Sequence, residues 1–279
     1  MGKSMTRRSF VKGALGATAW TALGASAGYS YWESGDLEVH ELNIPFQGLP
    51  KEFEGVKVAF LTDFHRGGLI SQEYVQKSVK RTLSLQPELI LLGGDYVDHD
   101  PKLIPPVMDA LGELKAPLGV FAVQGNRDIR ANRILTSSEL ARQGITEITN
   151  KGVWLERQGS RLYLAGFDDV TLGHPDIPAG IAGATPEAVI LALTHSPALV
   201  DRIRDPRIKL VCSGHTHGGQ INLPIIGAPI IPKGCEKYPI GLLPSATGNV
   251  FVSAGVGVAY APVRFRCPPE ISLLTLVPS

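Results

Sequence analysis

The chain has 279 residues, of which 44% are apolar, so it is long enough to bury one sizeable hydrophobic core. Its charges are balanced, with 27 Lys and Arg against 26 Asp and Glu, and the net charge is +1. This balance excludes the basic surface of a nucleic-acid coat protein, and we expect no stable nucleic-acid binding. The 31 glycines and 21 prolines indicate many tight loops, as in an enzyme whose strands end in short catalytic turns.

Residues 1–28 are interpreted as an export segment. The twin arginine Arg7-Arg8 precedes a mildly apolar stretch rich in Ala and Gly, which is the pattern of a twin-arginine signal. Small residues at 25–28 offer a cleavage site, and without cleavage the segment would remain as a membrane anchor. We therefore expect the twin-arginine machinery to export the chain to the periplasm or cell envelope.

Residues 29–54 are interpreted as a linker and lead-in, and the predicted domain spans residues 55–279. The first half of this domain alternates strands with helices. Continuous apolar runs predict buried strands, and apolar residues at helical spacing predict helices, the first of them capped by Ser71. The predicted elements are a strand at 56–62, a helix at 71–86, a strand at 88–94, a helix at 102–115, a strand at 119–125 and a helix at 131–143.

The second half of the domain is rich in strands. A hairpin that turns at Gln158-Gly159 is predicted over residues 152–169. Further strands are predicted at 188–195, 208–215, 249–255 and 270–277. Two sheets packed face to face, with helices outside, accommodate both halves. We therefore predict an α/β fold, a two-sheet β-sandwich flanked by helices on both sides.

Carboxylate, amide and imidazole side chains gather where the predicted strands end. In extended backbone, residues i and i+2 point the same way, so Asp63 with His65, and His215 with His217, should each reach one place. Open α/β sheets place their sites at this edge. The candidate ligands are Asp63, His65, Asp95, Asn126, His195, His215 and His217. Such a set suits a pair of divalent metal ions such as Mn, Fe or Zn, and it lacks the thiolates of a structural zinc site.

The three cysteines, Cys212, Cys235 and Cys267, form no CxxC motif. In an oxidising compartment a bridge between Cys235 and Cys267 is open to the chain. The alternative is three free thiols that are mostly buried.

The ordered pattern DFH…GGDYVD…GNRD…H…GHTH, over about residues 56–255, resembles the calcineurin-like metallophosphoesterase superfamily. The resemblance implies a sandwich of two sheets and a site for two metals. Carried over by motif, one metal would be bound by Asp63, His65 and His217, the other by Asn126, His195 and His215, and both by Asp95. The implied reaction is hydrolysis of a phosphodiester or pyrophosphate bond by a hydroxide that bridges the metals.

Three further histidines, His40, His99 and His174, match no position of the family. We interpret them as surface residues, with His99 the nearest to the rim of the pocket. A non-catalytic scaffold that keeps the fold is an alternative to an enzyme, although every ligand position of the family is filled.

Arg127 departs from the family pattern. Many members have histidine at this position, assigned as general acid and held by the aspartate of GDxxD, here Asp98. Arginine keeps its proton at any working pH, but it can bind phosphate oxygens through a bidentate contact that Asp98 orients. This departure favours pyrophosphates, activated diesters or aryl-type leaving groups. The alternative for Arg127 is a surface ion pair with Asp98 or Asp128.

A narrower resemblance is to the bacterial twin-arginine-type phosphodiesterases, through RRSF, LILLGGDYVD, CSGHTHGGQIN and SAGVG. The loop at 222–234 that follows is expected to form a pocket wall. It is apolar enough to contact a lipid tail or a membrane surface, and the alternative is a loop that packs against the body of the domain. GNRD also occurs in UDP-2,3-diacylglucosamine pyrophosphohydrolases, so a lipid-linked pyrophosphate is the alternative substrate.

Overall fold

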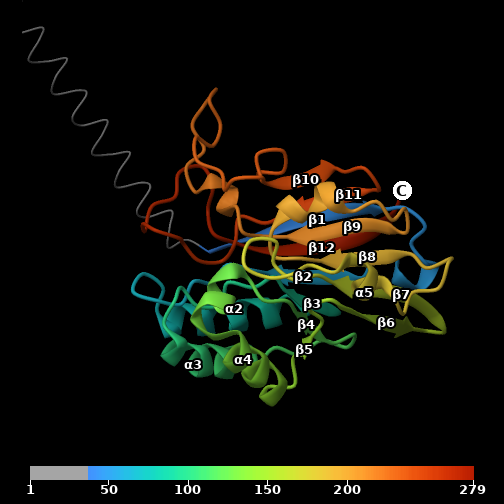
Figure 1. Cartoon of the computed structure of the whole chain (residues 1–279), viewed down its shortest axis with the longest axis horizontal. Helices are drawn as coiled ribbons and strands as arrows, with labels where there is room; N and C mark the ends of the chain where they lie inside the picture. The colour runs from blue at the N-terminus through green and yellow to red at the C-terminus, as the bar shows by residue number, and fades with distance from the viewer. Residues whose placement is uncertain (1–36) are drawn as a thin grey trace, which may run out of the picture.

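The computed structural model describes residues 37–279, and the segment predicted as a twin-arginine signal lies outside them. Two mixed sheets of six strands each pack face to face (Figure 1). The first contains, in spatial order, β1 (Glu38–Phe46), β12 (Glu270–Pro278), β2 (Lys57–Leu61), β3 (Leu89–Leu92), β4 (Val120–Ala122) and β5 (Thr146–Glu147). The second contains β10 (Gly241–Pro244), β11 (Asn249–Val252), β9 (Ile208–Ser213), β8 (Ile190–Leu193), β7 (Ser160–Gly166) and β6 (Lys151–Arg157).

Helices cover the outer face of each sheet. α2 (Gln72–Ser84), α3 (Ile104–Leu111) and α4 (Asn126–Arg142) pack on the first sheet and lie together on one side of the molecule (Figure 1). The short helix α5 (Ile177–Ile181) and the 3-10 turn η3 (Pro197–Arg202) pack on the second sheet. This arrangement confirms the predicted two-sheet sandwich with flanking helices. Within residues 37–279, no helix is both long and apolar enough to cross a membrane.

The central strands are apolar on both faces because two layers cover them. In β3, Leu89 and Leu91 face the core between the sheets, whereas Ile90 and Leu92 face the helices. Such strands read as continuous apolar runs, which is why the sequence predicts them well. β2, β3 and β4 run parallel, as do β7, β8, β9 and β11, so residues that follow parallel neighbours emerge at the same sheet edge.

Local signals confirm two further predictions. The hydroxyl oxygen of Ser71 accepts a hydrogen bond from the backbone N–H of Tyr74 at 3.2 Å and caps α2. The hairpin of β6 and β7 turns at Gln158 and Gly159, whose φ angles of 49° and 86° are those of a two-residue type I′ turn.

The predicted linker and lead-in at 29–54 needs correction, because Glu38–Phe46 forms β1 and pairs in parallel with β12. β1 is an edge strand, and most of its side chains are at least partly exposed. It therefore lacks the long apolar run of a central strand. Pro45 further weakens the sequence signal, since proline is tolerated in strands mainly at an edge.

The predicted helix at 131–143 begins earlier than expected, since α4 starts at Asn126. The backbone leaves helical geometry at Asn132, where φ is −175° and ψ is 95°. The helix begins with three polar residues, Asn126, Arg127 and Asp128, so apolar spacing does not reveal its start. Asn126 therefore stands at the start of a helix.

All three cysteines are buried, and none of them forms a disulfide. The alternative of free thiols is therefore correct, and the structure does not contain a bridge between Cys235 and Cys267. Burial raises the pKa of Cys212 to about 12, which leaves this thiol protonated and unreactive at neutral pH.

Candidate metal centre

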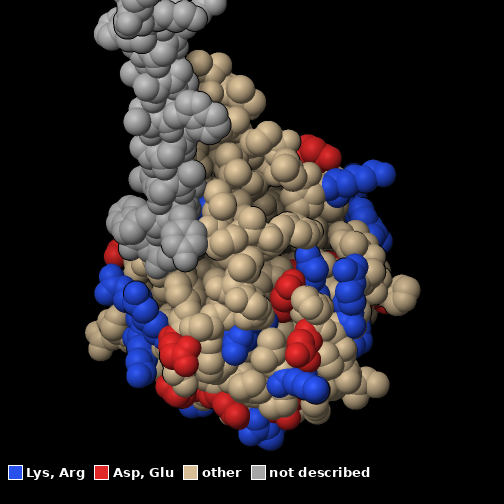
Figure 2. All heavy atoms as spheres, turned by 90° about the vertical axis from the view of Figure 1, so that its left-hand side faces the viewer, with Lys and Arg blue, Asp and Glu red and all other residues tan. Residues whose placement is uncertain are grey.

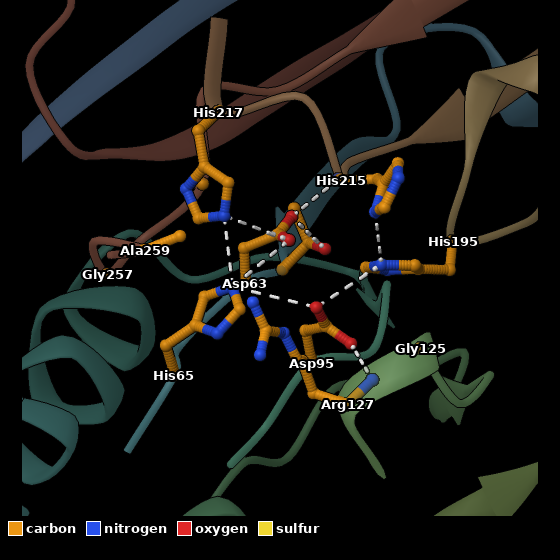
Figure 3. A network of polar contacts seen from close by, with 12 residues as sticks. Asp63, His65, Asp95, Gly125, Arg127, His195, His215, His217, Gly257 and Ala259 are labelled. Atoms are coloured by element: carbon orange, nitrogen blue, oxygen red, sulfur yellow. Dashed lines mark hydrogen bonds and ion pairs between the residues drawn. The ribbon is translucent and has the colours of Figure 1, made fainter. Parts of the chain in front are cut away.

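Two groups of side chains meet where strands from both sheets end (Figure 3). In each group the candidate ligand atoms lie within 4.8 Å of one another. The first group contains Asp63, His65 and His217, and the second contains Asp95, His195 and His215. Their positions follow β2, β3, β8 and β9 in the chain. The structure therefore brings together residues that are more than 150 positions apart in the sequence.

Imidazole nitrogens face each other inside both groups. Nε2 of His65 lies 2.9 Å from Nε2 of His217, and Nε2 of His195 lies 3.1 Å from Nδ1 of His215. The other nitrogen of His195, Nδ1, donates to the carbonyl oxygen of Gly93 at 2.8 Å, which presents Nε2 to the site. Convergent ring nitrogens of this kind are suited to share a cation.

Asp95 stands between the two groups (Figure 3). Its Oδ2 lies 3.6 Å from Nε2 of His65 in the first group and 3.5 Å from Nε2 of His195 in the second. Its Oδ1 accepts a hydrogen bond from the backbone N–H of Arg127 at 2.8 Å. One carboxylate thus reaches both groups, as a ligand shared by two ions must.

Two buried oxygens test whether these residues fit metal ions. Among the described residues, Oδ1 of Asp63 and Oδ1 of Asn126 have no hydrogen-bond partner. The other oxygen of Asp63 is fully used, since it accepts from the hydroxyl of Thr62 at 2.7 Å and the N–H of His215 at 2.8 Å. Buried oxygens left unpaired are costly unless something positive binds them. Oxygen atoms of this kind beside imidazoles fit two divalent cations.

Electrostatics keeps both aspartates of these groups ionised. Burial raises the pKa of Asp63, but the nearby imidazoles, His217 first, outweigh burial and hold this pKa well below its usual range. Burial likewise raises the pKa of Asp95, and the charge of His195 brings it down to about 2. Both side chains are therefore anionic at neutral pH and able to bind a cation.

The backbone turns sharply at the candidate ligands. Asp63, His65, Asp95, His215 and His217 all have positive φ angles, between 48° and 69°. This left-handed conformation is uncommon outside glycine, and it gathers at functional sites where the surrounding fold enforces it. The expectation that each i, i+2 pair converges through extended backbone is therefore wrong in its geometry. The turns that follow β2, β3 and β9 are left-handed, and they direct His215 and His217 to different groups.

The turns after β3 and β4 pack directly against each other. A Cβ atom at Gly94 would lie 2.3 Å from the backbone nitrogen of Gly125, and one at Gly125 would lie 2.2 Å from Oδ1 of Asp95. Only glycine permits this approach. The glycines beside Asp95 and Asn126 therefore set the distance between two candidate ligands.

Asp128 joins these same two turns. It is fully buried, and its carboxylate accepts hydrogen bonds from the N–H groups of Asp95 at 2.7 Å, Tyr96 at 2.9 Å and Gly125 at 3.0 Å. It is therefore not the surface partner of Arg127 that the sequence left open. The aspartate of GNRD holds the backbone that carries Asp95.

Arg127 lines the pocket, and 15% of its side chain is exposed. Its Nη1 lies 3.5 Å from Oδ1 of Asp98, and its guanidinium lies 5.2 Å from the ring centre of Tyr260. Asp98 also lies 3.9 Å from Nδ1 of His65. Asp98 thus forms an ion pair with Arg127 beside the first group. The pocket position argues against the alternative of a surface ion pair.

The remaining histidines stand apart from the pocket lining. His99 is mostly exposed and contacts Asp98 through Nδ1 at 2.9 Å. His40 pairs with Glu270 at 3.2 Å, and His174 is exposed. His99 is thus a neighbour of Asp98 without reaching the pocket itself.

Arg264 is a functional candidate that the sequence did not reveal. Its side chain is completely buried behind His217, with Nη2 3.5 Å from Nδ1 of that ring. Nη1 donates to the carbonyl oxygen of Cys267 at 2.9 Å, and Nη2 donates to those of Ala254 at 2.7 Å and Gly257 at 2.6 Å. Arginine is usually exposed, and no motif marks this one. Arg264 therefore joins two loops behind one candidate ligand.

Substitution Arg264→Lys is expected to weaken metal binding by the first group about 10–100-fold, the usual effect of losing a group that orients a ligand. A lysine ammonium is a point charge and cannot serve carbonyls on two loops at once. Competition with a chelator, analysed for two binding steps, would measure the change. A variant that melts earlier but keeps both metal affinities would show that Arg264 serves stability alone.

The pocket over the two groups has a volume of about 190 Å³. Its polar lining includes Arg127 and the candidate ligands other than Asp63 and His195. Its apolar lining includes Ile230, Ile231, Pro232 and Tyr260. The loop at 222–234 therefore forms a pocket wall, as the sequence predicts.

Comparisons with known proteins agree with this geometry. Residues 56–219 match the family described as calcineurin-like phosphoesterase. The chain is 32% identical to the uncharacterized metallophosphoesterase YkuE of Bacillus subtilis, covering 98% of each chain. It is 30% identical to the phosphodiesterase YaeI of Escherichia coli, covering 98% of this chain and 100% of the relative. An uncharacterized metallophosphoesterase of Aquifex aeolicus is also 30% identical, over 89% of this chain and 95% of the relative.

Proposed function

Because the chain belongs to the calcineurin-like phosphoesterase family and is a phosphoric ester hydrolase, we propose that it hydrolyses a phosphodiester with two divalent metal ions. The position of Asp95 carries this proposal, since its Oδ2 lies within 3.6 Å of a histidine nitrogen in each group. Asp63, His65 and His217 would hold one ion. Asn126, His195 and His215 would hold the other, and Asp95 would contact both.

When bound, the two ions activate a water molecule and neutralise charge on the phosphate oxygens. The chain's own residues then place the substrate. Arg127 faces the pocket and offers a forked pair of N–H donors to a phosphate oxygen, while Asp98 holds the guanidinium in position. Arg127 does not release its proton at neutral pH, and Asp63 and Asp95 are ionised, so none of these three side chains supplies a proton to the leaving oxygen.

This lack of an acid points to substrates whose leaving group departs without a proton from a side chain. Activated diesters and pyrophosphates meet this condition most readily, alkyl diesters meet it when water supplies the proton, and alkyl phosphomonoesters do not meet it. The relative named a phosphodiesterase, YaeI of Escherichia coli, supports the diester over a pyrophosphate such as UDP-diacylglucosamine. We therefore propose a phosphodiester, in preference to a pyrophosphate, as the substrate.

A hydrolysis screen with bound metal quantified tests the proposal. It compares bis-p-nitrophenyl phosphate, p-nitrophenyl phosphate, nucleotide diphosphate sugars and phospholipids. Preferred hydrolysis of the diester, with close to two metal ions per chain, is the expected result. Preferred hydrolysis of the monoester or of the nucleotide diphosphate sugar would refute the diester assignment.

We also propose that the chain is exported by the twin-arginine route and acts in the periplasm or cell envelope. The basis is the sequence around Arg7 and Arg8. Replacing both by lysine is expected to block export and leave the domain folded, because the transport machinery reads the pair. Cell fractionation with immunodetection, plus melting of the retained protein, would measure both effects. Arrival of the double variant in the periplasm would rule out a twin-arginine signal.

A further inference from the structure

We propose that two loops beside the metal centre contact a phospholipid bilayer, and that the substrate is a phosphodiester presented by that bilayer. The apolar rim is defined by Ile225, Ile226, Ile230 and Tyr260. The substrate part of this inference rests on the proposed function. The oxygen of a water molecule would form a new bond to phosphorus, and the bond from phosphorus to the alcohol oxygen would break. A proton of that water would pass through solvent to the departing oxygen, which yields a phosphomonoester and an alcohol. The contact part rests on the rim alone.

The rim exposes an unusual amount of apolar surface. Ile225 is fully exposed, and the exposed fractions of Ile226, Ile230 and Tyr260 are 72%, 76% and 91%. Within residues 37–279, only seven large apolar side chains are exposed, and these are four of them. The alternative that the loop at 222–234 merely packs against the domain therefore fails for its tip. Clustered apolar exposure of this kind marks an interaction site.

The tip is built to hold its isoleucines outward. Leu223 and Gly227 exchange two backbone hydrogen bonds of 2.8 Å, which close a small hairpin around Ile225 and Ile226. This hairpin projects from the body of the molecule at the upper left of Figure 1. Ile225 has a φ of 72°, a conformation that a β-branched residue adopts only at a cost. Asparagine or glycine would suit that position in water, so an exposed isoleucine there requires another explanation.

The two loops of the rim form one platform. Gln220 ties them, since its Oε1 accepts from the N–H of Ala259 and its Nε2 donates to the carbonyl oxygen of Val263 at 3.1 Å. Asn222 adds a backbone hydrogen bond to Phe265 at 2.8 Å. Gln220 follows His217 closely in the chain, so the rim is held in a set position relative to the metal centre.

Charge is absent from the tip and present beside it. Residues 221–232 contain no Asp, Glu, Lys or Arg, and exposed Lys233 follows directly. On the face drawn in Figure 2, most charged side chains lie in the lower half and at the right-hand edge, and the upper middle of the coloured surface is uncharged. Aliphatic tips with an adjacent cation suit an interface that contains anionic lipids.

The rim continues into the pocket. Ile230 and Tyr260 are exposed to solvent and also line the pocket that contains candidate ligands. Tyr260 additionally lies over the guanidinium of Arg127, which faces the phosphate position. A phosphodiester that remains in a bilayer would have its phosphate at the ions and its apolar part along this wall. Four side chains cover far less than the roughly 800 Å² per partner of a stable protein interface, so a second copy fits the rim poorly.

Insertion of the tip can be measured directly on the full chain. The variant Ile226→Trp is mixed with vesicles of equal parts phosphatidylcholine and phosphatidylglycerol whose acyl chains carry bromine. We expect the added tryptophan emission to be quenched. The matched control is Ile134→Trp, whose parent side chain is 80% exposed on α4, outside the pocket lining. Its added emission should not be quenched. Equal quenching of the two variants, or none, would overturn the membrane contact, whatever else in the chain binds vesicles.

A second variant separates contact from catalysis. Ile225→Asn with Ile226→Ser keeps the hairpin, since asparagine accepts positive φ, and neither parent residue lines the pocket. Hydrolysis of phosphatidylglycerol in vesicles should fall at least about tenfold, while soluble bis-p-nitrophenyl phosphate is turned over at the wild-type rate. Equal losses on both substrates, or no loss on vesicles, would refute the lipid substrate. Failure of the wild-type protein to cleave the soluble diester would instead refute the proposed function.

Discussion

Replacing Asp95 by asparagine is expected to abolish hydrolysis and to lower the metal content of the purified protein. The carboxylate of Asp95 is anionic at neutral pH and lies within 3.6 Å of both histidine groups. An amide has one neutral oxygen and cannot serve two cations in this way. We therefore expect both ions to bind more weakly and turnover to fall at least about 100-fold. Elemental analysis of the protein, with a bis-p-nitrophenyl phosphate assay, measures both effects.

A matched control for this substitution is Asp109→Asn. Asp109 is exposed, and it pairs on the surface with Arg142. Its loss should leave metal content and turnover unchanged. An Asp95→Asn protein that retains two ions and turns over at the wild-type rate would reject the assignment of Asp95 to both ions.

Truncation of Arg127 to alanine should keep both metal ions and remove about 2–4 kcal/mol of transition-state stabilisation, the scale of one preorganised donor. The ions should remain because the candidate ligand is Asn126, and the backbone N–H of Arg127 that binds Asp95 is unaffected. Arg127→Lys should recover part of the loss, since it supplies a point charge without the fork. The loss and the partial recovery are measured as kcat/KM of the wild-type protein and the two variants on an aryl diester. Arg161→Ala, which removes an arginine outside the pocket, is the control.

Arg127→His is expected to behave differently from both of these. A histidine beside Asp98 is a titratable acid, so activity on substrates with poor leaving groups should rise relative to aryl diesters. The pH–rate profile should gain a limb that belongs to this histidine. Full activity of Arg127→Ala on every substrate class would mean that the arginine is only a surface charge. Loss of metal from that variant would mean that Arg127 holds Asn126 in place at the start of α4.

The chemistry of the site could be predicted from the sequence because it depends on residue types at strand ends. Apolar runs locate β2, β3, β8 and β9, and the side chains that follow them are the ones that converge in the structure. A strand that is covered on both faces consists of apolar residues throughout, so the sequence alone locates the central strands. The strand β1 was not predicted, because an edge strand is largely exposed and needs few apolar residues.

Only the tertiary structure decided how the candidate ligands meet. The positive φ angles at Asp63 and His65 are enforced by long-range hydrogen bonds to the turn after β3, from the N–H of Asp63 to Gly94 and from that of His65 to Asp95. No local pattern encodes such a conformation. The position of Asp95 between the groups likewise depends on strands from two sheets.

The tertiary structure also decided which single side chains are buried. Arg264 and Asp128 are polar residues that a sequence reading assigns to the surface, yet both are fully buried and hold loops around the metal centre. Ile225 and Ile226 are the opposite case, apolar and exposed. Residue type predicts burial only on average, because a charge can be buried wherever folding supplies its hydrogen-bond partners. An apolar side chain stays exposed where the hairpin carrying it leaves the body of the domain.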